Sequence, residues 1–311
     1  MALFLGIDGG GTKTTCAIGD DNNILATAES GGSNPIRSGD STARTSLHDA
    51  IRQVCAGAGV DPAAISSACM GASGGAHSEK SRRLEQILAE LLPGKVCVLG
   101  DMEIALQAAF GAGPGVITIA GTGSISFGRD AGGRTLRIGG WGFAISDEGS
   151  GQWIGRTAVS RALRARDDGE APALLPRILN AWKLDAFDGL IPVANSSPPP
   201  DFSALFPTVL AAADAGDPLA RSVLSDAGVE LARLATTVIR LLSPGPEPGV
   251  PLAMTGGVFR QSALVRQVFY NRVRSDYPQA AVNPTVIEPV RGALELARLA
   301  VGLSPARHEI P

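Results

Sequence analysis

Hydrophobic and polar positions alternate with two periods along this chain, and the pattern predicts an α/β protein. Short apolar runs of strand length are followed by longer segments in which apolar residues recur every three or four positions, as on one face of a helix. The expected strands are 3–8, 14–19, 23–28, 63–70, 95–99, 116–120, 124–129 and 282–287, and the stretch 252–258 is expected to be a strand that runs into a Gly-Gly turn. The expected helices are 40–57, 78–92, 102–110, 153–166, 172–181, 203–215, 218–242, 259–275 and 291–302. Residues 184–201 carry three consecutive prolines and are expected to be irregular.

The second half of the chain restarts the pattern of the first. A strand at 116–120, a glycine turn, a strand at 124–129 and a hairpin through Asp130–Arg134 repeat the opening order of elements. At 311 residues the chain also exceeds what one hydrophobic core normally fills. The pattern therefore predicts a duplicated unit and two domains.

The first strand ends in an acid and a run of glycines, which is the first candidate for chemistry. Asp8 is followed by Gly9, Gly10 and Gly11, and then by Thr12 and Lys13. Glycines permit backbone angles that other residues cannot adopt, and a tight turn can point several N–H groups at phosphate oxygens. An acid at the end of the strand suits Mg²⁺, which prefers oxygen ligands. A glycine-rich hairpin without a ligand is the alternative for this turn taken alone.

Two later turns repeat the arrangement. One apolar strand runs into Gly121-Thr122-Gly123-Ser124, and another runs into Thr255-Gly256-Gly257. Neither the G-x-x-x-x-G-K-[ST] loop nor the G-x-G-x-x-G turn of dinucleotide-binding proteins is present. Each turn taken alone is a weak signal, and the three together, two of them with hydroxyls, extend over most of the chain.

Asp101 follows the apolar run at 95–99 and precedes a predicted helix. Ligands of open α/β sheets bind beyond the carboxyl ends of the strands, where this acid is expected. An aspartate there can accept the proton of an attacking hydroxyl, or it can cap the helix, and the two roles are compatible.

Composition excludes several classes of function. The formal net charge is −3 and no basic run occurs, so a nucleic-acid partner is not expected. No apolar stretch approaches the ~18–20 residues that span a bilayer, and no basic leader precedes the first strand, so no membrane partner and a cytoplasmic location are expected. Cysteines 16, 55, 69 and 97 are widely spaced and are expected to be buried, reduced thiols. Histidines 48, 77 and 308 are expected at the surface.

The order Asp-Gly-Gly-Gly-Thr-Lys, Gly-Thr-Gly-Ser and Thr-Gly-Gly resembles the phosphate 1, phosphate 2 and adenosine motifs of the sugar kinase/actin/Hsp70 ATPase superfamily. Four further matches make the chain most similar to the BadF/BadG/BcrA/BcrD ATPase family, and within it to N-acetylglucosamine kinases and glucosamine kinases. These matches are Gly32-Ser33-Asn34, Ser73-Gly74-Gly75, Gly100-Asp101 and Gly139-Gly140-Trp141-Gly142 with the following Ser146–Ser150.

The resemblance implies an α/β fold of two ribonuclease H-like domains, a duplicated actin-like ATPase fold with an interdomain cleft. The first domain would comprise 1–112 and 290–311 and carry the sugar loops. The second would comprise 113–289 and carry the adenosine site. For the assembly of the chain, a homodimer is left open as an alternative to a monomer.

The resemblance also implies the activity, an ATP-dependent and Mg²⁺-dependent transfer of a phosphoryl group to the 6-hydroxyl of N-acetylglucosamine. The partners are then a small-molecule sugar and a nucleotide. Asp101 would be the catalytic base and Asp8 the metal ligand. The nucleotide would contact Gly9, Gly10, Gly11, Thr12, Lys13, Gly121, Thr122, Gly123, Ser124, Gly256 and Gly257. The sugar would contact Asn34, Ser73, Asp101, Gly140 and Asp147.

Alternatives within the family stay open. One is a glucosamine kinase, because Met102 and Glu103 depart from the residues commoner after the catalytic aspartate. Another is an ATPase that activates a dehydratase, which would need cysteines placed to hold an iron–sulfur cluster. Trp141 would either meet the apolar face of the sugar or lie in the core, and Glu148 is a less certain sugar contact.

Overall fold

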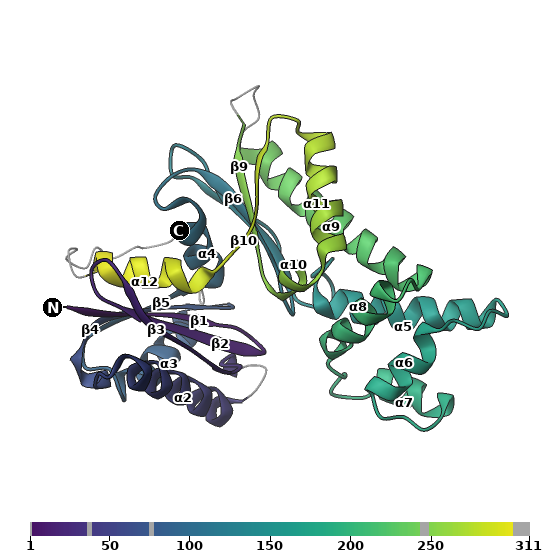
Figure 1. The fold of residues 1–311 in the computed structure, drawn as a ribbon, viewed down its shortest axis with the longest axis horizontal. Coiled ribbons are helices and arrows are strands. Elements are labelled where there is room, and N and C mark those ends of the chain that lie inside the picture. Colours follow the sequence, from purple (N-terminus) through teal and green to yellow (C-terminus); the bar gives the residue numbers. More distant parts are fainter. Residues whose placement is uncertain (1, 36–38, 75–77, 243–248, 301–311) are drawn as a thin grey trace. The chain divides into compact units, whose positions relative to one another are not determined.

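The protein is described here by a computed structural model, shown as a ribbon in Figure 1. The described residues are 2–35, 39–74, 78–242 and 249–300. They divide into two compact units. Unit 1 combines the described residues up to Gly113 with those from Ile287 onwards, and unit 2 is Pro114–Val286.

Unit 1 is built on a five-stranded mixed sheet in the order β3-β2-β1-β4-β5. β1 pairs antiparallel with β2 and parallel with β4, so Asp8 lies opposite Thr15 on one side and Gly71 on the other. The strands are β1 (Leu3–Gly9), β2 (Lys13–Gly19), β3 (Ile24–Gly31), β4 (Ile65–Ala72) and β5 (Lys95–Gly100).

Alternation along β1 assigns its side chains to two hydrophobic layers. Leu5 and Ile7 pack with α2 (Asp40–Ala58) and α3 (Ser78–Ala89). Phe4 points to the other face, where α4 (Asp101–Phe110) and α12 (Pro289–Ala300) complete a second layer. This is the period-2 pattern of a strand buried on both faces.

Within unit 1, two glycines let α12 pack closely against β1 and α4. A Cβ on Gly6 of β1 would lie 2.4 Å from the backbone nitrogen of Leu294. A Cβ on Gly292 of α12 would lie 2.0 Å from the carbonyl oxygen of Ile104 in α4. The last described helix is therefore an integral layer of the unit that contains the first strand.

Unit 2 repeats the sheet topology in the order β10-β9-β6-β7-β8. β6 pairs antiparallel with β7 and parallel with β9, as β1 pairs with β2 and β4. The strands are β6 (Gly115–Ala120), β7 (Ser124–Arg129), β8 (Thr135–Gly139), β9 (Pro251–Thr255) and β10 (Ala281–Ile287). The expected duplicated α/β fold is confirmed.

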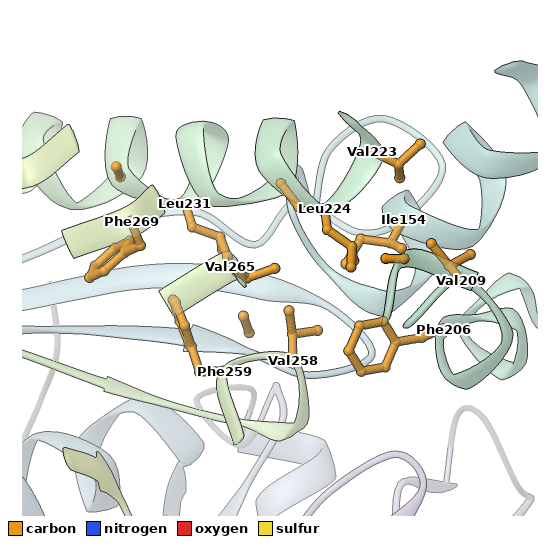
Figure 2. Packing of buried hydrophobic residues seen from close by; sticks show 14 of the residues in the cluster. Ile154, Phe206, Val209, Val223, Leu224, Leu231, Val258, Phe259, Val265 and Phe269 are labelled. Atoms are coloured by element: carbon orange, nitrogen blue, oxygen red, sulfur yellow. The ribbon is translucent and has the colours of Figure 1, made fainter. Parts of the chain in front are cut away.

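Helices bury one face of the second sheet in an extensive hydrophobic core (Figure 2). Leu231 on α9 lies near Val265 and Phe269 on α11, and the rings of Phe259 and Phe269 meet edge to face at 5.0 Å between centroids. The helices are α5 (Gly151–Asp167), α6 (Leu174–Ala181), α7 (Leu190–Ala194), α8 (Phe206–Asp214), α9 (Pro218–Leu242), α10 (Gly257–Gln261) and α11 (Ala263–Asp276).

Three expected boundaries are wrong. Residues 184–201 include a 3₁₀ turn at Phe187–Gly189 and the short α7, because Leu190 is buried there. The expected helix 259–275 is two helices, since Ser262 is extended and its hydroxyl accepts the N–H of Val265 at 3.2 Å. The first residues of the expected strand 63–70 belong to a 3₁₀ turn at Pro62–Ala64, capped by the Asp61 carboxylate.

Among the described residues, no helix combines the length and the apolar character needed to cross a bilayer.

Candidate active site

The first glycine turn is a tight hairpin between β1 and β2. The N–H of Gly10 donates to the carbonyl of Lys13 at 2.9 Å, and the N–H of Ser33 donates to the carbonyl of Gly10 at 3.1 Å. A Cβ on Gly10 would lie 2.8 Å from the Lys13 carbonyl oxygen, and a Cβ on Gly9 would lie 2.9 Å from the Ser33 hydroxyl. Neither glycine has a positive φ, so glycine is required here for close approach and not, as expected, for unusual backbone angles.

The side chains of Asp8 and Lys13, on either side of this turn, differ in their surroundings. Asp8 is partly accessible and sits one residue before the end of β1. Lys13 opens β2, and its Nζ lies 2.5 Å from Oε1 of Glu29 on β3, with both side chains exposed. The lysine expected at the phosphates therefore lies on the surface of the β2–β3 ribbon, paired with an acid.

The second glycine turn is held by the start of α5. The N–H groups of Gly151 and Gln152 donate to the carbonyls of Gly121 and Thr122 at 2.8 and 3.3 Å. The hydroxyl of Ser124 donates to the carbonyl of Glu148 at 2.7 Å. Ser124 thus connects the turn to the segment before α5, a structural role that the sequence does not indicate.

Asp147 lies directly against this second turn. Its carboxylate accepts the backbone N–H groups of Gly142 and Ser124, and Oδ2 would be 2.8 Å from a Cβ on Gly123. Burial raises the pKa of Asp147, and the two N–H donors oppose the shift. Asp147 also holds a left-handed φ of 64°, which is uncommon outside glycine and marks functional sites. Gly140, in the same segment, has a φ of 70°.

The third glycine turn has the strongest requirement for glycine. Gly256 has a φ of 105°, and a Cβ there would lie 2.2 Å from the carbonyl oxygen of Ala120. Gly257 follows as the first residue of α10. The end of β9 is thereby packed directly onto the end of β6 beside the second turn.

Asp101 is the first residue of α4 and not its cap, which is Gly100. Its carboxylate accepts the N–H of Met102 at 3.0 Å, where the helix dipole favours a negative charge. Burial nevertheless raises the pKa of Asp101, against the opposing effects of that N–H and of the Lys80 ammonium. The carboxylate is therefore an unusually basic aspartate with a cation nearby.

Lys80, whose positive charge acts on Asp101, also contacts the other two expected sugar residues of unit 1. Its Nζ donates to Oδ1 of Asn34 at 3.1 Å and to the carbonyl oxygen of Ser73. Lys80 is a residue of this site that the motifs do not indicate, although it lies four residues before Leu84 on the buried stripe of α3. A charge on an apolar stripe is the signal that would have revealed it.

The structure decides the positions of two further side chains. Of the two alternatives for Trp141, burial in the core is wrong, because its side chain is 65% exposed, with the guanidinium of Arg137 4.3 Å from its ring centroid. His48 is buried with Nε2 3.2 Å from the carbonyl oxygen of Ile87, so its expected surface position is wrong. His77 and His308 lie outside the described residues.

All four cysteines are free thiols, three of them buried. Burial raises the pKa of Cys16 above its usual range and that of Cys55 to about 11. Cys69 and Cys97 are register partners on β4 and β5. The three buried thiols, Cys16, Cys55 and Cys69, all have a raised pKa and are poor metal ligands, since the thiolate is the ligand form.

Comparisons with known proteins agree on one family. The model of the BadF/BadG/BcrA/BcrD ATPase family matches residues 5–297. A protein of Clostridium acetobutylicum named N-acetylmuramic acid/N-acetylglucosamine kinase is 32% identical, over 96% of this chain and 99% of its own. The N-acetyl-D-glucosamine kinase of Dictyostelium discoideum is 30% identical, over 95% and 97%. A crystal structure from Chromobacterium violaceum, described as a candidate N-acetylglucosamine kinase, superposes with a TM-score of 0.75 at 26% identity, over 96% and 99%. The chain therefore belongs to the BadF/BadG/BcrA/BcrD ATPase family.

Proposed function

We propose that this protein is an ATP-dependent amino-sugar kinase that transfers the γ-phosphoryl group to the 6-hydroxyl of N-acetylglucosamine. The observation that carries the proposal is Asp101, a carboxylate of raised pKa at the start of α4, beside Lys80 and the two loops that carry Asn34 and Ser73. The full-length relatives named N-acetylglucosamine kinases support the substrate.

On the acceptor side, Asp101 is the proposed base. A sugar hydroxyl is a weak nucleophile, and an aspartate within hydrogen-bond reach can accept its proton as it attacks. A raised pKa improves that proton transfer as long as the carboxylate stays ionised at the working pH. Asn34 and Ser73 supply polar groups for the ring hydroxyls. Asp147 and Gly140 are proposed as further sugar contacts from unit 2.

On the nucleotide side, the glycine turns fit phosphates and adenosine. Side chains at Gly10, Gly123 or Gly256 would collide with neighbouring atoms, so these three positions accept only glycine and leave the backbone uncovered by a side chain there. When bound, ATP would supply the phosphoryl group and Mg²⁺ would neutralise part of the phosphate charge. Asp8 offers the carboxylate oxygen that Mg²⁺ prefers. Gly9, Gly11, Thr12, Lys13, Gly121, Thr122, Ser124 and Gly257 complete the proposed nucleotide set.

The proposal is tested by measuring ADP formation with N-acetylglucosamine, glucosamine, N-acetylmuramic acid and glucose. N-acetylglucosamine is expected to give the highest kcat/KM, and the product is expected to carry phosphate on O6 by phosphorus and carbon NMR. The matched control is 6-deoxy-N-acetylglucosamine, which keeps every other group and should give no sugar-dependent ADP. Preference for glucosamine would reassign the substrate. ADP formation that no sugar stimulates would reject the kinase and favour an activator-type ATPase.

The pH dependence of the reaction follows from Asp101. Its pKa is raised, so the carboxylate is protonated, and inactive as a base, at pH values where an exposed aspartate is still ionised. The acidic limb of the kcat/KM profile for the sugar is therefore expected above the pKa of an ordinary aspartate. A limb at the ordinary position would contradict the assigned surroundings of Asp101.

The cytoplasm is the proposed compartment. Support comes from the four free thiols, which a reducing environment preserves.

A further inference from the structure

The side chain of Lys80 lies among the residues of the acceptor side of unit 1. It is carried by the first turns of α3, yet its Nζ reaches Oδ1 of Asn34, which lies just after β3, and the carbonyl oxygen of Ser73, which lies just after β4. One ammonium therefore joins two loops that are far apart along the chain, because α2 and β4 lie between them. Two of its three donors are used in these contacts.

The charge of Lys80 also faces Asp101. Lys80 is half-buried, and loss of water lowers its pKa while the Asp101 carboxylate opposes that shift. Among the described residues, Lys80 is the charged group that acts on Asp101. Glu103, on the same turn of α4, acts on the thiols of Cys69 and Cys97. Glu295 of α12 lies beside Gln107, further along α4.

We propose that Lys80 is a positioning residue for the acceptor sugar: it fixes the Asn34 and Ser73 loops relative to each other and places a positive charge beside Asp101. The inference rests on the proposed kinase function. It adds a residue that acts through Asn34, Ser73 and Asp101, and it predicts separate consequences for binding and for proton transfer.

The two consequences follow from different properties of the ammonium. Loss of the donors leaves the Asn34 amide oxygen and the Ser73 carbonyl without this partner, so both loops loosen and sugar affinity falls. Loss of the charge removes the cation that lowers the Asp101 pKa, so the base is protonated at a higher pH. Among the described residues, Lys80 contacts Asn34 and Ser73 and acts on Asp101, all of which lie outside the proposed nucleotide set, so ATP binding should change much less than sugar binding.

The experiment uses the full chain with ATP, Mg²⁺ and N-acetylglucosamine. Lys80→Met is expected to raise the sugar KM about tenfold, to leave the ATP KM within about twofold, and to move the acidic limb of the kcat/KM profile to higher pH. Lys80→Gln keeps a donor without charge, so the limb should move in the same way with a smaller rise in KM. Lys80→Arg keeps the charge and should keep the limb in place.

The matched control is Arg83→Met on the same helix. Arg83 pairs with Asp40 in an exposed ion pair, so this variant removes a positive charge from α3 while leaving the Lys80 contacts to Asn34 and Ser73 in place, and it should keep both the sugar KM and the acidic limb. Should Lys80→Met not fold, Lys80→Gln and Lys80→Arg give the same two readouts.

The inference fails if the Lys80 variants keep the wild-type sugar KM and the wild-type limb, or if Arg83→Met reproduces their losses. Wild-type ADP formation that sugar does not stimulate would instead reject the proposed function, and this inference with it.

Discussion

Asp101→Asn is expected to lower kcat about 10²–10⁴-fold, the usual contribution of general-base catalysis. Asparagine has nearly the same shape and can still accept the N–H of Met102, so the start of α4 should persist. It cannot take the proton of the attacking hydroxyl. The KM values for sugar and ATP should change much less than kcat, and steady-state kinetics with calorimetric titration of both ligands measures the difference.

Glu103→Gln is the control for this variant. It removes a second acid from the same first turn of α4 and should leave kcat within a few-fold. If Asp101→Asn keeps near-wild-type turnover, Asp101 is not the base. If Glu103→Gln loses as much turnover as Asp101→Asn, the loss comes from removing negative charge at the start of α4 and not from removing the base.

Gly256→Ala is expected to destabilise unit 2 by about 2–5 kcal/mol, the sum of a strained left-handed backbone and an overpacked contact. The backbone at Gly256 has a φ of 105°, and the added methyl would lie 2.2 Å from the Ala120 carbonyl oxygen, which is backbone and cannot swing away. The end of β9 would then separate from β6. The thermal unfolding midpoint should fall, and ATP affinity should fall with it.

Gly57→Ala is the matched control, because it adds the same methyl group elsewhere. Gly57 lies in α2, and its added Cβ would meet the Cβ of Ala26 at 3.4 Å, an ordinary contact. Replacing a helical glycine by alanine should stabilise the chain by up to about 1 kcal/mol. A Gly256→Ala protein as stable as the wild type, with unchanged ATP affinity, would contradict the role given to the third turn.

Much of the fold could be predicted because its signals are local. Apolar runs ending in glycine turns identified the strands, and periodic segments such as 218–242 identified helices to within a few residues. The helix boundary at Ser262 was not predicted because the apolar periodicity continues through it. Only the hydrogen bond from the N–H of Val265 to the Ser262 hydroxyl reveals it. The short helix α7 was not predicted because the prolines nearby favour irregular structure. Burial of Leu190, a tertiary effect, outweighs them.

The sequence indicates candidate site residues one motif at a time, but it does not indicate the contacts that these residues make. The sequence indicates an acid after β5 and hydroxyls in the glycine turns, since both depend on position within one motif. It does not indicate that Ser124 donates to Glu148, or that Lys13 pairs with Glu29. Lys80 shows the same limit, because its partners lie 46 and 7 residues away and only the folded sheet brings them together.

The position of α12 also determines the order in which the protein can mature during synthesis. Unit 2 is one continuous stretch of chain, so every contact within it is available once Val286 has left the ribosome. Phe4, Ala17 and Ile104 are made much earlier, yet the layer that buries them includes Val290, Ala293 and Leu294 of α12. The half of the protein that is translated first is thus the last to be completed, and its apolar sheet face must stay protected from aggregation in the meantime.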